Sequence, residues 1–182
     1  LGTNSVVAQL LAGKVPVMSA ADLYLNEHRE YGLSTYSLHS DGSGVCYSSR
    51  LRPILNMRPK YRHWLSPSLW QLNADLHLTD WLEEKNIDFD VMTDEDLHVE
   101  GVDLLNRYKC VLTGSHPEYS SEKMLAAYES YQLNGGRWIY LGADGFYWIS
   151  EYHPDNLNII EVRKGEAGTR AWTANPGEYN NA

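Results

Sequence analysis

The sequence predicts an α/β domain in three layers, built on an open and mostly parallel β-sheet with a loop-rich amino-terminal segment. Two apolar runs, at residues 108–113 and 137–141, have the length of buried strands, and an amphipathic stretch lies between them. Strands that alternate with helices at this spacing indicate crossover connections and parallel pairing. With 43% hydrophobic and 21% charged residues, the chain can bury the core of one domain over residues 1–182.

The first third of the chain, residues 1–60, is rich in glycine, serine and tyrosine. Residues 31–44 contain several turn formers and few candidates for a packed helix. A loop of this length in a compact domain is usually functional or disordered, and its aromatic content favours a functional role. We therefore expect residues 1–60 to supply part of a site.

The pattern of strands and helices sharpens in the next part of the chain, residues 61–150, which is the expected βα core. Leu72, Leu78, Trp81 and Leu82 fall roughly on one face of a helix, which predicts a helix over residues 69–85.

Three further elements are expected between this helix and the strand at residues 137–141, besides the strand at residues 108–113. Residues 87–92 alternate between apolar and acidic side chains, which predicts a strand. Thr93 precedes three acids that suit the first turn of a helix, so a short helix is expected over residues 94–106. Another helix is expected to begin near Ser120 and to end where Asn134 precedes two glycines.

The last part of the chain, residues 151–182, reads as the start of further strands. Residues 159–163 and 170–172 predict one or two strands, and antiparallel pairing is an alternative for these strands. The chain begins with Leu1 rather than Met and ends as abruptly, so we expect a fragment of a longer subunit.

Composition excludes several function classes. The net charge of −9 argues against nucleic-acid binding, which needs a basic face. No apolar run is long enough to span a membrane and no signal peptide is visible, so a cytoplasmic location is expected by default. A bridge between Cys46 and Cys110 is left open, but two cysteines do not make a disulfide framework, and Cys110 reads as a small core residue. A serine-hydrolase elbow and a phosphate-binding loop are both missing from the sequence.

Polar side chains follow the ends of two successive predicted strands. Ser115, His116 and Glu118 come after the first, and Asp144 and Tyr147 come after the second. In open α/β sheets chemistry gathers beyond the carboxyl ends of the strands, so neighbouring strands would bring these groups into one crevice. Glu118 would also lie near a helix amino terminus, where the dipole stabilises a carboxylate.

Each of these side chains also has a purely structural interpretation, and the residues alone leave both open. Glu118 can simply complement the helix dipole, and His116 can be a hydrogen-bonded histidine before a proline turn. Asp144 precedes a glycine, which is typical of a tight turn, and Tyr147 suits a core or a pocket wall.

A second polar cluster lies in the amino-terminal loop, at Tyr36, His39 and Asp41. Asp41 precedes a glycine and suits a turn. Tyr36 has no obvious core to fill, although a packing anchor remains an alternative. Asp75 and His77, on the helix expected over the following segment, are interpreted as a solvated face or as groups behind a site.

The motifs at these positions resemble the large subunit of the N,N-dimethylformamidase family. The matching segments are residues 31–53, 113–119, 142–148, 161–166 and 170–172. They follow one another in the family's order over most of the chain, and several are long and unusual.

The resemblance implies a scaffold like that of the class I glutamine amidotransferases, which is flavodoxin-like, without their nucleophilic cysteine. It also implies an amidase that cleaves N-substituted formamides to formate and an amine, with a mononuclear iron held by two tyrosines and one glutamate. By motif, Tyr36 and Glu118 match iron ligands and His116 matches a histidine beside the metal. Asp144 stands where the family usually has a substrate-contacting Asn, and Tyr147 is expected to join it.

These implied groups form a coherent set for amide hydrolysis. A phenol binds as phenolate only when a strong Lewis acid displaces its proton, as ferric iron does. The metal would polarise the formamide carbonyl or activate water, and His116 would pass a proton to the departing amine. The expected catalytic residues are therefore His116 and Glu118.

The resemblance places the other tyrosine ligand upstream of this chain, with Tyr24 and Tyr31 as weaker alternatives. The isolated chain is therefore expected to hold metal weakly and to lack activity. The implied partners are a small amide substrate, the rest of the large subunit, a small subunit and further copies in a homo-oligomer. The alternatives are a non-catalytic amidotransferase-like module that binds a small molecule or a protein, and a related metal-dependent amidase with another substrate.

Overall fold

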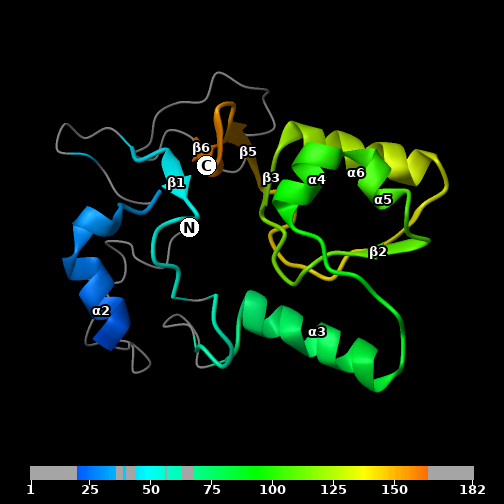
Figure 1. Cartoon of the computed structure of the whole chain (residues 1–182), viewed down its shortest axis with the longest axis horizontal. Coiled ribbons are helices and arrows are strands. Elements are labelled where there is room, and N and C mark those ends of the chain that lie inside the picture. The colour runs from blue at the N-terminus through cyan, green and yellow to red at the C-terminus, as the bar shows by residue number, and fades with distance from the viewer. Residues whose placement is uncertain (1–19, 36–38, 40–43, 56, 63–67, 164–182) are drawn as a thin grey trace. The chain divides into compact units, whose positions relative to one another are not determined.

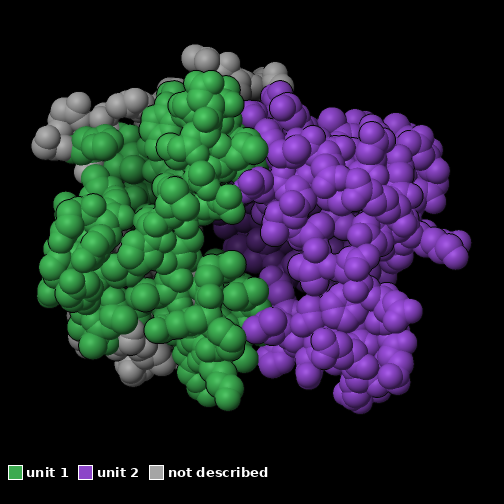
Figure 2. Space-filling view, in the orientation of Figure 1, with its two compact units in different colours: residues 1–73, 152–182 green, residues 74–151 purple. Residues whose placement is uncertain are grey.

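The protein is described by a computed structural model that covers residues 20–35, 39, 44–55, 57–62 and 68–163. The chain divides into two compact units, which are described separately (Figure 2). Unit 1 comprises residues 1–73 and 152–182, and unit 2 comprises residues 74–151. The sequence-based division into segments ending at residues 60 and 150 stays a prediction.

Unit 2 carries most of the helices and all of the parallel strand pairing (Figure 1). Its elements, including α3 and β5 at its two boundaries, are α3 (Leu72–Glu84), α4 (Asp94–Glu100), α5 (Val102–Leu105), β2 (Cys110–Leu112), β3 (Tyr119–Ser120), α6 (Glu122–Leu133), β4 (Arg137–Ile139) and β5 (Trp148–His153). The expected strands at 108–113 and 137–141 are thus confirmed as β2 and β4, each shorter than predicted.

The strands of unit 2 pair in parallel, as the alternation of helices and strands predicts. In the pair β2 and β4, Cys110 lies opposite Arg137 and Leu112 lies opposite Ile139. In the second pair, β3 and β5, Tyr119 lies opposite Trp148. Both pairs are joined by long connections, which is what parallel strands require.

The core of unit 2 lies between the helices α4, α5 and α6 and strand β2 (Figure 1). Its buried members are Leu97, Leu104, Leu105, Val111, Met124, Ala127 and Tyr131. Burying a side chain of this size stabilises the fold by about 1.5–3 kcal/mol relative to leaving it in water. These contacts therefore hold the strand that leads into the candidate site.

Local sequence explains where these helices begin and end. Thr93 caps α4, because its hydroxyl accepts the Asp96 N–H and the Asp96 carboxylate accepts the Thr93 N–H. Ser121 caps α6 in the same way through the Met124 N–H. The helix expected over residues 94–106 is instead two helices, because Gly101 adopts a φ of 63° that a continuous helix does not allow.

Unit 1 contains the helix α2 (Ala20–Glu27), a 3₁₀ helix η1 (Arg29–Tyr31) and the strands β1 (Tyr47–Ser49) and β6 (Asn156–Val162). Strands β1 and β6 pair antiparallel, with Ser48 opposite Ile160. The strand expected at 159–163 is therefore confirmed within β6, while the one expected at 170–172 lies outside the described residues. Asp22 is buried and accepts a hydrogen bond from the Tyr61 hydroxyl at 2.7 Å.

The prediction of a mostly parallel sheet is only partly confirmed. The hydrogen-bonded strand order is β1-β6-β5-β3 in one sheet and β2-β4 in the other, and the first sheet mixes parallel and antiparallel pairs. The boundary between the two units falls within β5. The fold is therefore mixed α/β.

The strand expected over residues 87–92 is absent, since these residues have no regular secondary structure. Ile87 is 45% exposed and Val91 is 75% exposed, so the alternating pattern does not produce a buried face. A strand is stabilised mainly by packing and burial of its side chains, which explains why the pattern alone was misleading.

Both cysteines, Cys46 and Cys110, are free thiols. Among the described residues, every helix falls short of the length and apolar character needed to cross a membrane.

Candidate functional site

The loops that follow β2 and β4 lie side by side in unit 2. Backbone N–H groups of the second loop donate to the first along most of its length, from Ala143 to the Ser115 carbonyl (3.2 Å), from Phe146 to the Pro117 carbonyl (2.8 Å) and from Trp148 to the Glu118 carbonyl (3.0 Å). The Leu141 N–H also donates to the Thr113 hydroxyl. The two strand ends that the sequence singled out are therefore neighbours.

Close approach of these loops depends on Gly142. A Cβ atom at this position would lie 2.2 Å from Pro117 Cδ and 3.2 Å from the Gly114 carbonyl oxygen. Such contacts are far inside van der Waals distance, so a larger residue would separate the loops.

An imidazole and two carboxylates meet where the loops run together. His116 Nε2 lies 3.0 Å from Glu118 Oε2 and 3.7 Å from Asp144 Oδ2. The His116 and Glu118 side chains are only 12% and 15% exposed, whereas Asp144 is 60% exposed. An ionised carboxylate only accepts hydrogen bonds, so Nε2 is the protonated nitrogen of His116 when it bonds to Glu118.

Asp144 belongs to this cluster and also lies in a tight turn, which is the structural role that the sequence left open for it. Its φ is 48°, a left-handed conformation that aspartate tolerates better than most residues. Phe146, two residues later, has a φ of 58°, and its ring packs edge-on against Trp138 at 5.6 Å. The aromatic packing holds the loop in a conformation that a bulky residue adopts at a cost.

The structure brings His116, Glu118 and Asp144 together, and it places the other expected residues elsewhere or leaves them out. Tyr147 is 37% exposed and packs edge-on against Trp148. Tyr36 lies outside the described residues, although Ser34 and Thr35 just before it are buried in unit 1. Convergence of Tyr36 and Glu118 on one ion therefore stays a prediction.

The two weaker candidates for a tyrosine ligand, Tyr24 and Tyr31, contact each other in unit 1. Their hydroxyl oxygens lie 3.4 Å apart, and the Tyr24 ring also stacks on His28. The hydrogen bond to Tyr31 and the charges nearby raise the pKa of Tyr24 above its ordinary value. The protonated phenol is thus favoured at Tyr24, which weakens it as a phenolate ligand.

The described residues fit a metal only in part. Among them, no cluster of three or more histidine, cysteine, aspartate or glutamate side chains has the geometry of a metal site. Glu118 alone suits a hard cation, because its carboxylate is oriented by an imidazole as metal-binding carboxylates commonly are. The buried Ser115 hydroxyl beside this pair lacks a hydrogen-bond partner within the described part of the chain.

Sequence reasoning left two interpretations for Asp75, on α3: a solvated side chain or a group behind the site. Its Oδ1 accepts the Ser115 N–H at 2.6 Å, so it is not a solvated carboxylate. A signal was present, since Asp75 follows Leu72 by three positions and precedes Leu82 by seven, which puts it on the leucine face of the helix. A carboxylate on an apolar face needs a polar partner.

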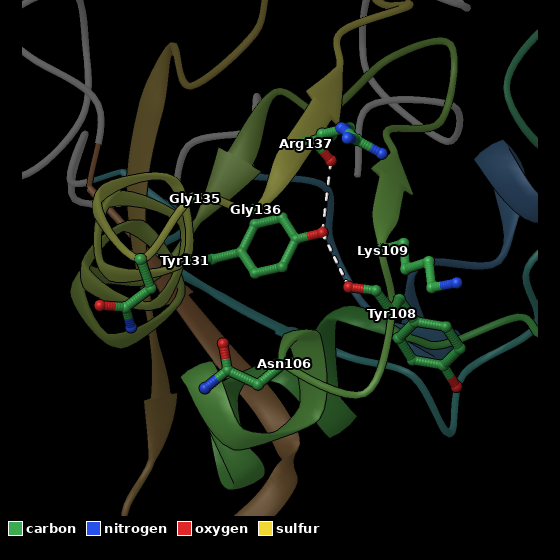
Figure 3. A pocket seen from close by; sticks show the side chains of 8 residues that line it. Asn106, Tyr108, Lys109, Tyr131, Gly135, Gly136 and Arg137 are labelled. Carbon is green, nitrogen blue, oxygen red and sulfur yellow. Dashed lines mark hydrogen bonds between the residues drawn. The ribbon is translucent and has the colours of Figure 1, made fainter.

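A separate hollow of about 500 Å³ lies at the opposite, amino-terminal ends of β2 and β4 (Figure 3). It is lined by Asn106, Tyr108, Lys109, Tyr131, Asn134, Gly135, Gly136 and Arg137. The Tyr131 hydroxyl lies at its centre and donates to the Tyr108 carbonyl at 3.0 Å. The His116 cluster, formed by His116, Glu118 and Asp144, lies beyond the carboxyl ends of the strands. Ligands of parallel sheets bind at those ends, which favours the His116 cluster over this hollow as the functional site.

Comparison with known proteins identifies relatives across nearly the whole chain. Residues 18–182 match the family described as N,N-dimethylformamidase beta subunit-like, C-terminal. The N,N-dimethylformamidase beta subunit of Paracoccus aminophilus is 51% identical over 175 residues, and that of Alcaligenes sp is 50% identical over 175 residues. Each match covers 96% of this chain but only 23% of the relative.

The agreement between these comparisons is sufficient to assign the family. The matched region includes every segment in which the sequence resembles that family, and it contains the His116 cluster. The chain belongs to the N,N-dimethylformamidase beta subunit-like C-terminal family.

Proposed function

We propose that this chain is the metal-bearing part of an amide hydrolase of the N,N-dimethylformamidase type, which cleaves N-substituted formamides to formate and an amine. The observation that carries the proposal is the His116–Glu118 pair, at 3.0 Å, beyond the carboxyl end of β2 in a member of this family. The relatives are named as beta subunits of that enzyme, and the chain spans 23% of their length.

Glu118 and Tyr36 are the residues of this chain that would hold a mononuclear ferric iron, together with a tyrosine from outside it. Carboxylate and phenolate oxygens are hard donors that suit such a cation. When bound, the iron would supply Lewis acidity that polarises the substrate carbonyl. The His116 hydrogen bond would keep one carboxylate oxygen of Glu118 in a fixed direction.

His116 is the proposed proton carrier. Its Nε2 faces two carboxylates, Glu118 at 3.0 Å and Asp144 at 3.7 Å. Release of an amine requires a proton on the departing nitrogen, and imidazole is the side chain whose titration range suits that transfer at neutral pH. The part of the His116 side chain that stays exposed leaves a path for its proton to reach a bound amide.

Asp144 and Tyr147 are the proposed substrate contacts. Asp144 is exposed enough to meet a bound amide, and Tyr147 lies three residues along the same loop. A carboxylate accepts hydrogen bonds but does not donate them, unlike the amide of the Asn usual in the family. This difference favours a related substrate, one that offers an N–H donor, over a fully N-alkylated formamide.

The wider setting of the site is also proposed from the family. The amidotransferase-like scaffold is supported by parallel pairing of β2 with β4 and by a site beyond their carboxyl ends. Cys46 is buried and Cys110 lies within β2, so neither suits the role of an exposed nucleophile. The rest of the large subunit, a small subunit and further copies of the enzyme are the proposed partners, in the cytoplasm.

Replacing Glu118 in the intact subunit tests this function. We expect Glu118→Ala to lose both bound iron and amide hydrolysis, because it removes the one described ligand. Iron is measured by elemental analysis and by the visible absorption of ferric phenolate, and turnover is measured as formate release. Glu122→Ala, an exposed glutamate at the start of α6, is the matched control and should retain both.

Two results would contradict the proposal. Full iron content in Glu118→Ala would remove Glu118 from the ligand set. A colourless, iron-free wild-type subunit that releases no formate from a panel of amides would instead favour a non-catalytic binding module.

A further inference from the structure

We infer that Asp75 is a positioning residue, which holds the turn that carries His116 and Glu118 in its working geometry. The Asp75 carboxylate, on α3, accepts the backbone N–H of Ser115 with an N···Oδ1 distance of 2.6 Å. Ser115 is the residue directly before His116. The catalytic meaning of this contact rests on the proposed function, whereas the contact itself does not.

The contact is of a strong and directional kind. A hydrogen bond from a backbone amide to an ionised carboxylate is shorter than a neutral one and about twice as strong. Ser115 N and the Asp75 side chain are partly buried, so water competes less for either group than it would at the surface. The bond therefore restricts the chain at one end of the short segment between Ser115 and Glu118.

Gly114 is what allows the carboxylate to come so close. A Cβ atom at Gly114 would lie 3.1 Å from Asp75 Oδ2 and 3.3 Å from both Cγ and Oδ1. These distances are tighter than ordinary carbon contacts, so an alanine here would push the carboxylate away by a few tenths of an ångström. The position of the Asp75 carboxylate therefore depends on the absence of a side chain at Gly114.

The turn is held from its other side by the loop after β4. Ala143 donates to the Ser115 carbonyl and Phe146 donates to the Pro117 carbonyl. Ser115 is therefore fixed through its N–H by α3 and through its C=O by the second loop. This double attachment sets the direction in which the next side chain, His116, leaves the backbone.

Asp75 is expected to act through the geometry of His116 and Glu118. A displacement of about 1 Å in a catalytic group can reduce the rate roughly 100-fold, because the reacting atoms are no longer aligned. Loss of the Asp75 bond should therefore lower kcat more than it raises KM. An asparagine side chain at this position would retain a carbonyl oxygen able to accept the Ser115 N–H, so Asp75→Asn should recover most of the effect.

The contact is tested first on the 182-residue chain by amide hydrogen exchange at Ser115. We expect exchange to become at least tenfold faster in Asp75→Leu, to stay near the wild-type rate in Asp75→Asn, and to accelerate in Gly114→Ala, where Asp75 is intact but displaced. Asp80→Leu, which removes an exposed carboxylate from the same helix, is the matched control and should leave Ser115 unchanged. Unchanged exchange in both Asp75→Leu and Gly114→Ala would overturn the inference.

The consequence is tested on the intact enzyme with its natural partners. Asp75→Leu should lower kcat about 10- to 100-fold with KM and iron content near the wild-type values, and Asp75→Asn should restore most of kcat. A full kcat in Asp75→Leu, with Ser115 exchange accelerated, would overturn the positioning role. A wild-type enzyme without amide hydrolysis would fail the proposed function, while the exchange experiment would still decide whether Asp75 holds the turn.

Discussion

The histidines of this chain show how much surroundings alter one side chain. His116 is only 12% exposed, and its Nε2 faces two carboxylates. His98 is buried to 6% exposure, and its Nδ1 lies 2.8 Å from the Ser121 hydroxyl that caps α6. Burial lowers the pKa of His98, Lys123 lowers it further, and Glu151 opposes both effects. His98 is therefore a structural histidine that favours its neutral form.

The buried His98 predicts a pH dependence of stability. An unfolded histidine titrates at about pH 6.5. Because the folded pKa is lowered, the unfolded state binds a proton first, so the contribution of His98 to the free energy of unfolding is constant above that pH and is lost as the pH decreases through it. Urea unfolding of the chain between pH 8 and pH 5 measures this loss.

Removing the imidazole checks the origin of that loss. His98→Gln should reduce the decline in unfolding free energy between pH 7 and pH 5, while His77→Gln, at an exposed histidine of α3, should leave it as in the wild type. An equal decline in all three proteins would show that other groups cause it.

Single residues also mark the limit of sequence reasoning at the site. The rule that polar groups gather beyond strand ends was enough to predict that His116, Glu118 and Asp144 lie together. Asp75 was interpreted as part of a solvated face or as a group behind a site, and the sequence could not decide between the two because its partner is a backbone N–H distant in sequence. Backbone partners carry no sequence signal, so only the position of Asp75 on the leucine face pointed to a contact.

Among the elements, helices were predicted better than strands, and the reason lies in the residues that mark where helices begin. Thr93 and Ser121 cap helices through hydrogen bonds to residues three positions on, so the signal and its effect are both local. The strands β2 and β4 have three residues each and depend on a distant partner. Residues 87–92 show the consequence, since their pattern suits a strand but no partner buries Ile87 and Val91.

The pair β2 and β4 is reinforced at its amino-terminal end by Tyr131 of α6 (Figure 3). Its hydroxyl donates to the Tyr108 carbonyl at 3.0 Å and lies 3.4 Å from the Arg137 carbonyl, so it links the segment just before β2 to the first residue of β4. The ring fits only because Gly136 lacks a side chain, since a Cβ there would lie 2.4 Å from Tyr131 Cζ.

This arrangement predicts the effect of two substitutions at Tyr131. Tyr131→Phe should lower the free energy of unfolding by about 1 kcal/mol, because it removes the hydroxyl and keeps the ring. Tyr131→Leu should cost about 3 kcal/mol, because it also leaves a cavity in the core. Both are measured by urea unfolding, and an unchanged free energy of unfolding in Tyr131→Phe would show that the hydroxyl contributes nothing to the link between the strands.

At the scale of the whole molecule, the family could be recognised from the sequence but the completeness of the site could not. The resemblance rested on motifs that span both units, and the comparisons confirm it over residues 18–182. Each relative is matched over only 23% of its length. The described part of the site contains one of the proposed iron ligands, Glu118, whereas the proposed tyrosine ligands are Tyr36, which lies outside the described residues, and a tyrosine expected upstream of this chain.

The same reasoning predicts that the 182-residue chain binds iron more weakly than the intact subunit. Each missing phenolate removes a negatively charged ligand, and metal sites with fewer charged ligands bind more weakly. Ferric iron titration of both proteins, followed by visible absorption and by elemental analysis after gel filtration, measures the difference. We expect the intact subunit to keep its iron and the chain to lose most of it. Equal retention by both would show that this chain holds a complete ligand set, and the search for the second tyrosine would then return to Tyr24 and Tyr31.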